Sequence, residues 1–217
     1  MPIDGPTPRT TLKRRAQRGV YEHDAIVRIL DEGLVCHMAF VVDGQPFVLP
    51  TAYARIGDHL YLHGSPSNRM LRAGRDGLGL CVTVTLLDGV VLARSAFHHS
   101  MNYRSVMLLG AATEVDDLEE KRAAFHALVE HVVPGRYAGV RAPTDDELKG
   151  TLVLRLPISE GSAKIRSGPP IDDEDDYAWP VWAGVIPLAV QPGTPVPDPR
   201  LDPEHGLPAY ASAYARG

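Results

Sequence analysis

One stretch decides the fold: residues 34–56, which read LVCHMAFVVDGQPFVLPTAYARI. It contains two runs rich in β-branched and aromatic residues, separated by Asp43-Gly44. An Asp-Gly pair in this position strongly favours a two-residue hairpin turn. A second turn at Gly57-Asp58 precedes a further β-rich run, HLYLHG, at residues 59–64. The pattern therefore predicts a meander of three antiparallel strands.

The flanking sequence adds helices and further strands. Residues 24–33 carry apolar side chains at helical spacing and end in Gly33, which predicts a short amphipathic helix with a glycine cap. Residues 117–133 show the same spacing. Further strands are predicted at residues 78–88, 89–95, 102–115 and 151–167. Six or seven mostly antiparallel strands with two or three helices indicate an α+β protein built on a closed or nearly closed barrel.

Composition and motif content exclude several classes of protein. The chain has 217 residues, of which 44% are hydrophobic and 23% charged, which is ordinary for a soluble folded domain. Its two cysteines cannot form a disulfide framework, and it has no P-loop, G-x-G-x-x-G or G-x-S-x-G motif. The N-terminus lacks the apolar region of a secretory signal, and no apolar run is long enough to cross a membrane. We therefore expect a soluble, cytoplasmic protein.

Charge and proline content divide the chain into three segments. Residues 1–19 form a basic arm, with five Lys or Arg and no acidic residue among residues 9–18. Residues 20–167 carry nearly all of the periodic hydrophobic pattern and form the barrel domain. Residues 168–217 hold 10 of the 19 prolines, an acidic run at 172–176 and several large apolar residues. We interpret this last segment as an extended, proline-rich arm packed on the barrel.

The basic arm has two interpretations. It would become ordered on its own chain or on a partner subunit, or it would contact DNA. The net charge of −5 and the lack of a recognition motif favour the first interpretation. A DNA-binding regulator would instead show strongly salt-dependent binding. We therefore expect no nucleic-acid partner.

Two histidine pairs invite a metal interpretation. His126 and His131 lie five residues apart on a predicted helix, so their side chains point roughly 140° apart and cannot hold one ion. His98 and His99 are adjacent, and neighbouring side chains on a strand face opposite sides. We therefore expect surface histidines and no metal site.

The segment most typical of a binding site is LHGSPSNRMLRAGR, at residues 62–75. Ser65 is a favoured helix N-cap and the proline after it fits the first helical position, which predicts that a helix begins here. The free N–H groups of a helix start attract phosphate. Further donors follow within one turn: Ser67, Asn68 and Arg69. Plain helix capping with an exposed arginine is the alternative.

Two strand segments could add ligand contacts. The segment 102–115 carries Arg104 and Ser105 before an apolar run, and an ordinary barrel strand would look much the same. Pro50 interrupts a good strand, which predicts a bulge or an unpaired position there. Backbone groups of residues 49–52 would then be free to bind the edge of a ligand.

In this order, the three segments resemble the FMN-binding split-barrel superfamily, the pyridoxamine 5′-phosphate oxidase-like proteins. The resemblance is strongest to the flavin-nucleotide-binding branch that includes the nitroimidazole-resistance proteins. It covers residues 20–167 and is carried by VLPTAY (48–53), LYLHGSPSNRMLRA (60–73), LGLCVTVT (78–85) and YRSVMLLGAATEV (103–115). Residues 181–201 also resemble the C-terminal part of longer members. The arginine-containing C-terminal signature of true vitamin-B6 oxidases is not found, so oxidation of pyridoxamine phosphate is not expected.

The resemblance implies a homodimer of split β-barrels with FMN bound at the subunit interface. The phosphate-binding turn then corresponds to Ser65, Ser67, Asn68 and Arg69. The strand along the isoalloxazine ring corresponds to Pro50, Thr51 and Ala52. The strand in contact with flavin or phosphate corresponds to Tyr103, Arg104, Ser105 and Val106. His63 falls where nitroimidazole-resistance proteins have a histidine near the flavin, which makes it a candidate proton donor.

These residues lead to two hypotheses about function. The first is an FMN-dependent oxidoreductase that transfers a hydride through flavin N5 to or from a small organic substrate. The second is a protein that holds FMN or haem without turning over a substrate, because split barrels of this kind hold haem in some relatives and the chain has nine histidines. An absorption spectrum distinguishes flavin from haem.

Overall fold

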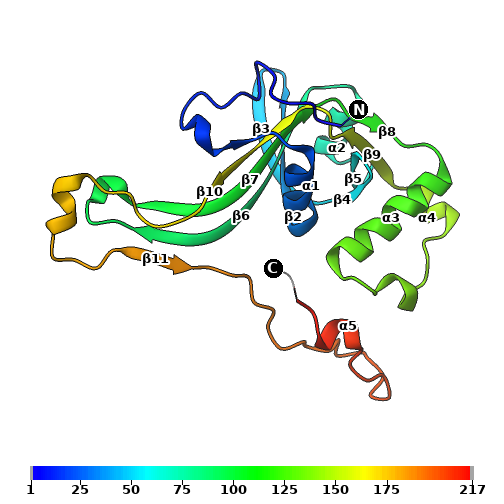
Figure 1. Ribbon diagram of the computed structural model, residues 1–217. Coiled ribbons are helices and arrows are strands. Elements are labelled where there is room, and N and C mark those ends of the chain that lie inside the picture. The colour runs from blue at the N-terminus through cyan, green and yellow to red at the C-terminus, as the bar shows by residue number, and fades with distance from the viewer. Residues whose placement is uncertain (1, 216–217) are drawn as a thin grey trace.

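The computed structural model describes residues 2–215 and contains two antiparallel β-sheets that together form a split barrel (Figure 1). In the larger sheet, the strand order is β1-β10-β7-β6-β2-β3, and β11 pairs with β6. Its strands are β1 (Gly19–Val20), β2 (Val35–Val42), β3 (Gln45–Ala52), β6 (Leu80–Leu92), β7 (Ser100–Gly110), β10 (Gly161–Arg166) and β11 (Gly184–Pro187). The smaller sheet has the order β4-β5-β9-β8. Its strands are β4 (Ala54–Ile56), β5 (His59–Gly64), β8 (Thr113–Glu114) and β9 (Leu152–Pro157).

Helices flank the barrel, so the predicted α+β split barrel is confirmed. The helices are α1 (His23–Glu32), α2 (Arg69–Arg75), α3 (Leu118–Val132), α4 (Asp145–Lys149) and α5 (Ala209–Ser212). Helix α1 packs against β6 and β7, while α3 lies against the smaller sheet. No helix within residues 2–215 is long and apolar enough to span a bilayer.

The hairpin that begins the barrel is confirmed, but the three-strand meander is wrong. Asp43 and Gly44 have positive φ angles of 52° and 75°, as the tight turn between β2 and β3 requires. After β3, however, the chain crosses to the other sheet at Tyr53, so β4 pairs with β5 but not with β3. Tyr53 is fully buried and its hydroxyl donates a 2.6 Å hydrogen bond to the Leu30 carbonyl. That contact anchors the crossing.

Other strand boundaries also differ from the predicted ones. The runs 78–88 and 89–95 form one continuous strand, β6, because the chain after Leu87 makes a β-bulge against β7 instead of a turn. The run 102–115 separates into β7 and β8, and 151–167 separates into β9 and β10. In both cases the chain passes from one sheet to the other, and hydrophobic alternation does not distinguish between two sheets that share one core.

Gly33 ends α1 as predicted, but not for the predicted reason. Its φ of −71° is open to any residue, so no left-handed cap is present. A Cβ atom at this position would lie 2.4 Å from Cγ1 of Val84 and 2.9 Å from the Tyr53 hydroxyl. Glycine is needed here because the end of the helix lies directly against β6.

The core fills the space between the two sheets. Leu60 and Leu62 of β5 and Leu154 and Leu156 of β9 are all fully buried, and they point inward with the core residues of β2, β6 and β7. A second, smaller cluster around Tyr61 and Val153 joins the outer side of the smaller sheet to α3. The barrel therefore closes its own hydrophobic core.

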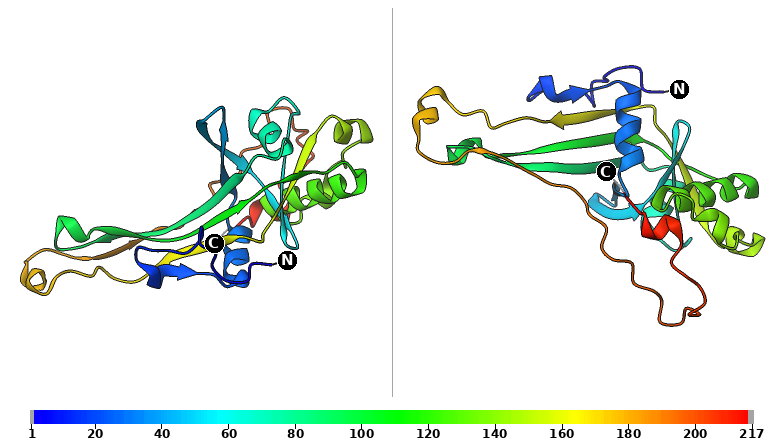
Figure 2. Two further views of the ribbon diagram at one scale, coloured as in Figure 1. Left: turned by 90° about the horizontal axis from the view of Figure 1, so that it is seen from above. Right: turned by 60° about the horizontal axis from the view of Figure 1, so that its bottom comes forward.

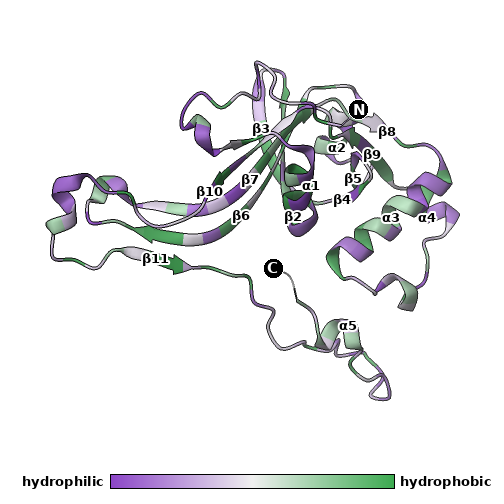
Figure 3. Ribbon diagram, viewed as in Figure 1, coloured by the Kyte–Doolittle hydropathy of each residue, from purple (hydrophilic) through white to green (hydrophobic). Residues whose placement is uncertain are grey.

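A long finger projects from the barrel (Figure 2). We define the finger as residues 88–103 and 168–188, which comprise the distal parts of β6 and β7, the returning chain and β11. Figure 3 shows hydrophobic residues along distal β6 and at the end of β11. Trp179 and Trp182 retain 64% and 67% of their surface exposed. Within one chain this part of the arm therefore follows the finger and leaves its tryptophans in solvent.

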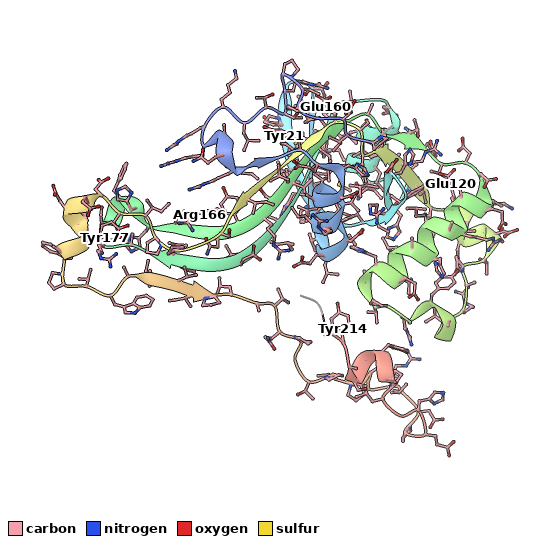
Figure 4. All side chains as sticks on the ribbon, viewed as in Figure 1. Tyr21, Glu120, Glu160, Arg166, Tyr177 and Tyr214 are labelled. Atoms are coloured by element: carbon pink, nitrogen blue, oxygen red, sulfur yellow. The ribbon has the colours of Figure 1, made fainter. Side chains whose placement is uncertain are left out.

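The basic arm and the last described part of the C-terminal arm contact the rest of the chain at different places. In the basic arm, Thr7 Oγ1 donates a 2.6 Å hydrogen bond to Glu160, which also pairs with Arg9 (Figure 4). After the finger, the chain returns to the end of α3, where the Tyr214 hydroxyl donates to the Val132 carbonyl at 3.0 Å. The arm is thus held at both of its ends.

Candidate functional site

The outer face of the larger sheet carries two neighbouring hollows. We define this outer face by the side chains that point away from the core. They are His37, Ala39 and Val41 of β2, Pro46, Val48, Pro50 and Ala52 of β3, Cys81, Thr83 and Thr85 of β6, and Tyr103, Ser105, Met107 and Leu109 of β7. Two hollows of about 560 and 410 Å³ lie on it. Arg9 of the basic arm lines both hollows.

Strand β3 forms the free edge of this face. Its register with β2 runs without interruption, with Pro50 opposite His37 and Pro46 opposite Val41. Of the two alternatives predicted at Pro50, the bulge is therefore absent and the unpaired position on an edge strand applies. Proline is tolerated because β3 is the outermost strand and the missing N–H groups are on its open side. Pro50 and Ala52 lie on the outer face, whereas Thr51 points toward the core beside Cys36. Only part of this predicted set can therefore contact a ligand on the face.

The loop before α2 carries the predicted phosphate ligands, but its cap differs from the prediction. Helix α2 begins at Arg69, and the side chain of Asn68 caps it by accepting from the backbone of Met70 at 2.9 Å. Ser65 is not the N-cap: its hydroxyl lies 2.8 Å from that of Ser67. Sequence favoured Ser65 because Ser-Pro is a common helix start, but Asn is an equally good cap three residues later.

Arg69 is placed to bind an anion at the edge of β3. Its guanidinium lies 4.9 Å from the centre of the Phe47 ring, a cation–π contact. Within residues 2–215 no carboxylate pairs with it. Ser65 and Ser67 are exposed on the same loop. Two hydroxyls and an uncompensated guanidinium are the donors that a phosphate group requires.

Strand β7 contributes only half of its predicted residues to the outer face. Tyr103 and Ser105 point outward, but Val106 is buried in the core and Arg104 points toward α1. Arg104 Nη2 donates to Asp88 at 2.7 Å and to Glu32 at 2.7 Å. These two carboxylates raise the pKa of the guanidinium further above its usual range. Arg104 is therefore engaged in an ion-pair network on the side of α1, away from the outer face.

His63 lies behind the barrel and not on the outer face. Its ring packs edge-on against Phe125 of α3, with the ring centres 5.2 Å apart. Burial lowers its pKa, and its Nδ1 has no hydrogen-bond partner among residues 2–215. His63 and the Ser65–Arg69 loop follow each other in sequence, yet the side chain of His63 faces α3.

The predicted groups are not gathered around one point within a single chain. Pro50 and Ser105 share the outer face, but their strands β3 and β7 are three strand spacings apart, about 14 Å. A flavin ring on β3 therefore leaves β7 of the same chain out of reach.

His37 was not singled out by the sequence among the nine histidines. It stands on the outer face opposite Pro50 and Thr83, and it is exposed. It is the one polar residue in the otherwise apolar run VCHMAFVV, but that alone does not distinguish a functional side chain from a solvated one.

The chain belongs to a known family of split-barrel proteins. Residues 22–165 match the family model described as pyridoxamine 5′-phosphate oxidase. The fold, with its outer face and the polar loop before α2, agrees with this assignment, which confirms the resemblance found in the sequence. No curated protein sequence gives a significant match.

Two solved structures are similar over nearly the whole chain. The flavocytochrome Anf3 from Azotobacter vinelandii is 40% identical, with a TM-score of 0.92, over 99% of this chain and 100% of that one. An FAD and haem binding protein from Mycobacterium smegmatis is 37% identical, with a TM-score of 0.86, over 90% of this chain and 96% of that one. A candidate 5-nitroimidazole resistance protein from Bacteroides thetaiotaomicron is 24% identical (TM-score 0.56, 68% and 86% covered), and this likeness concerns the fold alone.

Proposed function

We propose that the protein binds a flavin on the outer face of the larger sheet and acts as a flavin-dependent oxidoreductase on a small organic substrate. The observation that carries the proposal is Arg69. Its guanidinium pairs with no carboxylate among residues 2–215, lies against Phe47 of the edge strand, and comes directly after the turn that holds the Ser65 and Ser67 hydroxyls. A flavin nucleotide combines a phosphate with a flat aromatic ring, and these two surfaces fit its two parts.

The chain's own residues would then have distinct tasks. Ser65, Ser67 and Arg69 would hold phosphate, while Pro50 and Ala52 would support the ring from the side of β3. Asn68 would keep the loop in shape by capping α2. Hydride and electron transfer are the chemistry that a flavin supplies when bound. His63 remains a candidate proton donor only if α3 moves, because its ring now packs on Phe125.

The proposed site requires a second copy of the chain. Tyr103 and Ser105 are about 14 Å from β3 in their own chain, which is three strand spacings. A twofold contact through the outer faces would bring these residues of one copy over β3 of the other. In this division, residues 20–167 hold the flavin, and the arms at 1–19 and 168–217 serve the contact between subunits. Sedimentation of the purified protein tests this step, and a strictly monomeric flavin-loaded species would contradict it.

The identity of the flavin is tested by the released cofactor. The sequence alone favours FMN, whereas the two similar structures are named for a flavocytochrome and for FAD and haem. On that basis we propose FAD over FMN. Mass spectrometry of the cofactor released by heat gives the answer directly. A protein without any flavin absorbance, before and after incubation with FAD or FMN, would refute the proposed function.

The phosphate contact is tested by Arg69→Ala. Loss of charge-assisted hydrogen bonds worth about 1.5–3 kcal/mol should weaken flavin binding roughly tenfold to a hundredfold. The matched control is Arg72→Ala, which removes an exposed arginine from the same helix. Equal flavin affinity in the two variants would show that Arg69 has only a structural role.

Haem binding is a second candidate function. It is favoured by the names of the two similar structures and by His37, an exposed imidazole on an apolar surface, which is what an axial haem ligand requires. His63 is the alternative ligand, because its Nδ1 has no partner among the described residues. A Soret band that is lost in His37→Ala and kept in His63→Ala would assign the ligand to His37. The reverse result would assign it to His63.

A further inference from the structure

The tip of the finger brings three possible metal ligands together. His98 ends a 3₁₀ helix, Ala96–His98, between β6 and β7, and Asp173 and Asp176 belong to the turn at the other side of the tip. One ligand atom from each side chain lies within 4.8 Å of the other two. The turn contains Tyr177, which Figure 4 places at the far end of the finger. The cluster thus joins the β6–β7 hairpin to the point where the C-terminal arm reverses direction.

His98 does not behave as the surface histidine that we expected. Its Nε2 atom has no contact with solvent and no hydrogen-bond partner among residues 2–215. That atom lies 3.2 Å from Oδ2 of Asp173, but not in the geometry of a hydrogen bond. Two ligands at about 2.1 Å from one tetrahedral zinc ion would be about 3.4 Å apart. The separation therefore suits two atoms that share an ion.

The local charge favours a cation. Asp173 and Asp176 belong to an uninterrupted run of acidic residues at 172–176. The nearby Arg94 is already committed, because it donates to Asp172 at 3.1 Å and stacks on Tyr177. Neither carboxylate of the cluster pairs with a lysine or arginine of the described chain. Negative potential is thus concentrated beside an imidazole nitrogen that makes no hydrogen bond within residues 2–215.

We propose that His98, Asp173 and Asp176 bind a divalent transition-metal ion, with Zn²⁺ as the best match, and that this ion fastens the arm to the tip of the finger. An imidazole ligand selects such metals over Ca²⁺ and Mg²⁺, which prefer oxygen alone. Asp173 is 82% exposed, so water can complete the coordination. The proposal does not depend on flavin or haem.

The test is calorimetric titration of Zn²⁺ into the full-length protein, freed of any affinity tag. We expect one ion per chain and no comparable binding of Mg²⁺. His98→Asn and Asp176→Asn should each weaken Zn²⁺ binding at least tenfold. The controls are His99→Asn and Asp175→Asn, neighbours of the same type outside the cluster, and both should bind as the unaltered protein does.

A second measurement reports on the arm itself. Zn²⁺ should slow proteolysis of residues 168–188. It should also change the fluorescence of Trp179, whose backbone N–H donates to the Asp176 backbone carbonyl at 2.9 Å. Both effects should disappear in His98→Asn while its thermal unfolding in the absence of metal stays unchanged. Zn²⁺ binding of equal strength in all variants, or none in the unaltered protein, would overturn the proposal and reduce the cluster to an ion pair.

Discussion

The barrel and the finger are built from the same two strands, yet they differ in how they meet solvent. Near the barrel, β6 and β7 bury Val82, Val84 and Leu108 in a closed core. In the finger, the same strands leave Met101 54% exposed, and Phe97 at their connection is 88% exposed. The two strands thus leave large apolar side chains of the finger in solvent, and these side chains form a second apolar surface outside the barrel core.

The barrel and the finger should therefore be stabilised in different ways. The barrel satisfies the rule that a sheet must bury one face against another element. The finger is a three-stranded ribbon that buries Val91 and Ala93, which belong to neither hydrophobic cluster of the barrel. A ribbon with so small a buried face should be marginal in water. The barrel should therefore fold independently, whereas the finger should gain its order from a partner and from its tip.

The largest effect is expected from a cavity in the barrel. Leu154→Ala removes a fully buried side chain of β9 and should lower the free energy of unfolding by about 2–5 kcal/mol. Urea unfolding followed by circular dichroism measures this. If Leu154→Ala lowers the unfolding free energy less than a truncation of similar size in the finger, the idea that the core resides in the barrel is refuted.

Crowding at the end of α1 should give the next largest effect. Gly33→Ala places a Cβ atom 2.4 Å from Val84 and should destabilise the protein by about 1–3 kcal/mol. Gly139→Ala is the control, because no atom lies within 4 Å of its added Cβ. Equal unfolding midpoints for the two variants would mean that α1 can move away from β6 without cost.

At the tip, the expected effect is local. Burial alone would raise the pKa of Asp172, but hydrogen bonds from Arg94 and from the Ser95 N–H lower it. A lowered pKa means that the contact stabilises the tip fully above the unfolded value of about 3.9, and is lost as the pH falls through the folded value. Hydrogen exchange should therefore speed up around residues 168–176 in acid while the barrel stays protected. Asp172→Asn should reproduce this near neutral pH, and Asp175→Asn should not.

The smallest effect on folding is expected at the exposed tryptophan. Trp182→Ala should change the unfolding free energy of the dilute, monomeric chain by less than about 0.5 kcal/mol, because the side chain is 67% exposed. If the finger contacts a second copy, the same substitution should weaken self-association in sedimentation experiments. Unchanged self-association would leave the finger without a role at a subunit interface.

Local sequence patterns predicted most helices and strands of the barrel, but they predicted less well which strands pair with each other. Asp43-Gly44 and the spacing around Ile26 and Leu30 depend on neighbouring residues, and both predictions are confirmed. The crossing at Tyr53 depends on a hydroxyl that bonds to a carbonyl 23 residues earlier, which no local pattern contains. The strand β11 was missed because four residues next to prolines carry no clear alternation.

The candidate site was predictable in its residue types but not in their directions. Arg69 and Ser67 were singled out by their chemistry, and both are exposed, although the helix begins at Arg69 and not at Ser65 as expected. Arg104 was singled out for the same reason, but Glu32 and Asp88 engage it on the opposite face of β7. The sequence contains both carboxylates, yet only the three-dimensional packing of α1 brings Glu32 to this arginine.

The prolines of β3 also affect how the chain behaves at high concentration. An exposed edge strand normally offers a row of N–H groups onto which another strand can add, and this is how many sheet proteins aggregate. Pro46 and Pro50 have no backbone N–H, so the open edge of β3 lacks two of these donors. Edge-on growth toward a fibril is therefore disfavoured on this side of the sheet, which leaves the face of β3 as the better surface for an approaching chain.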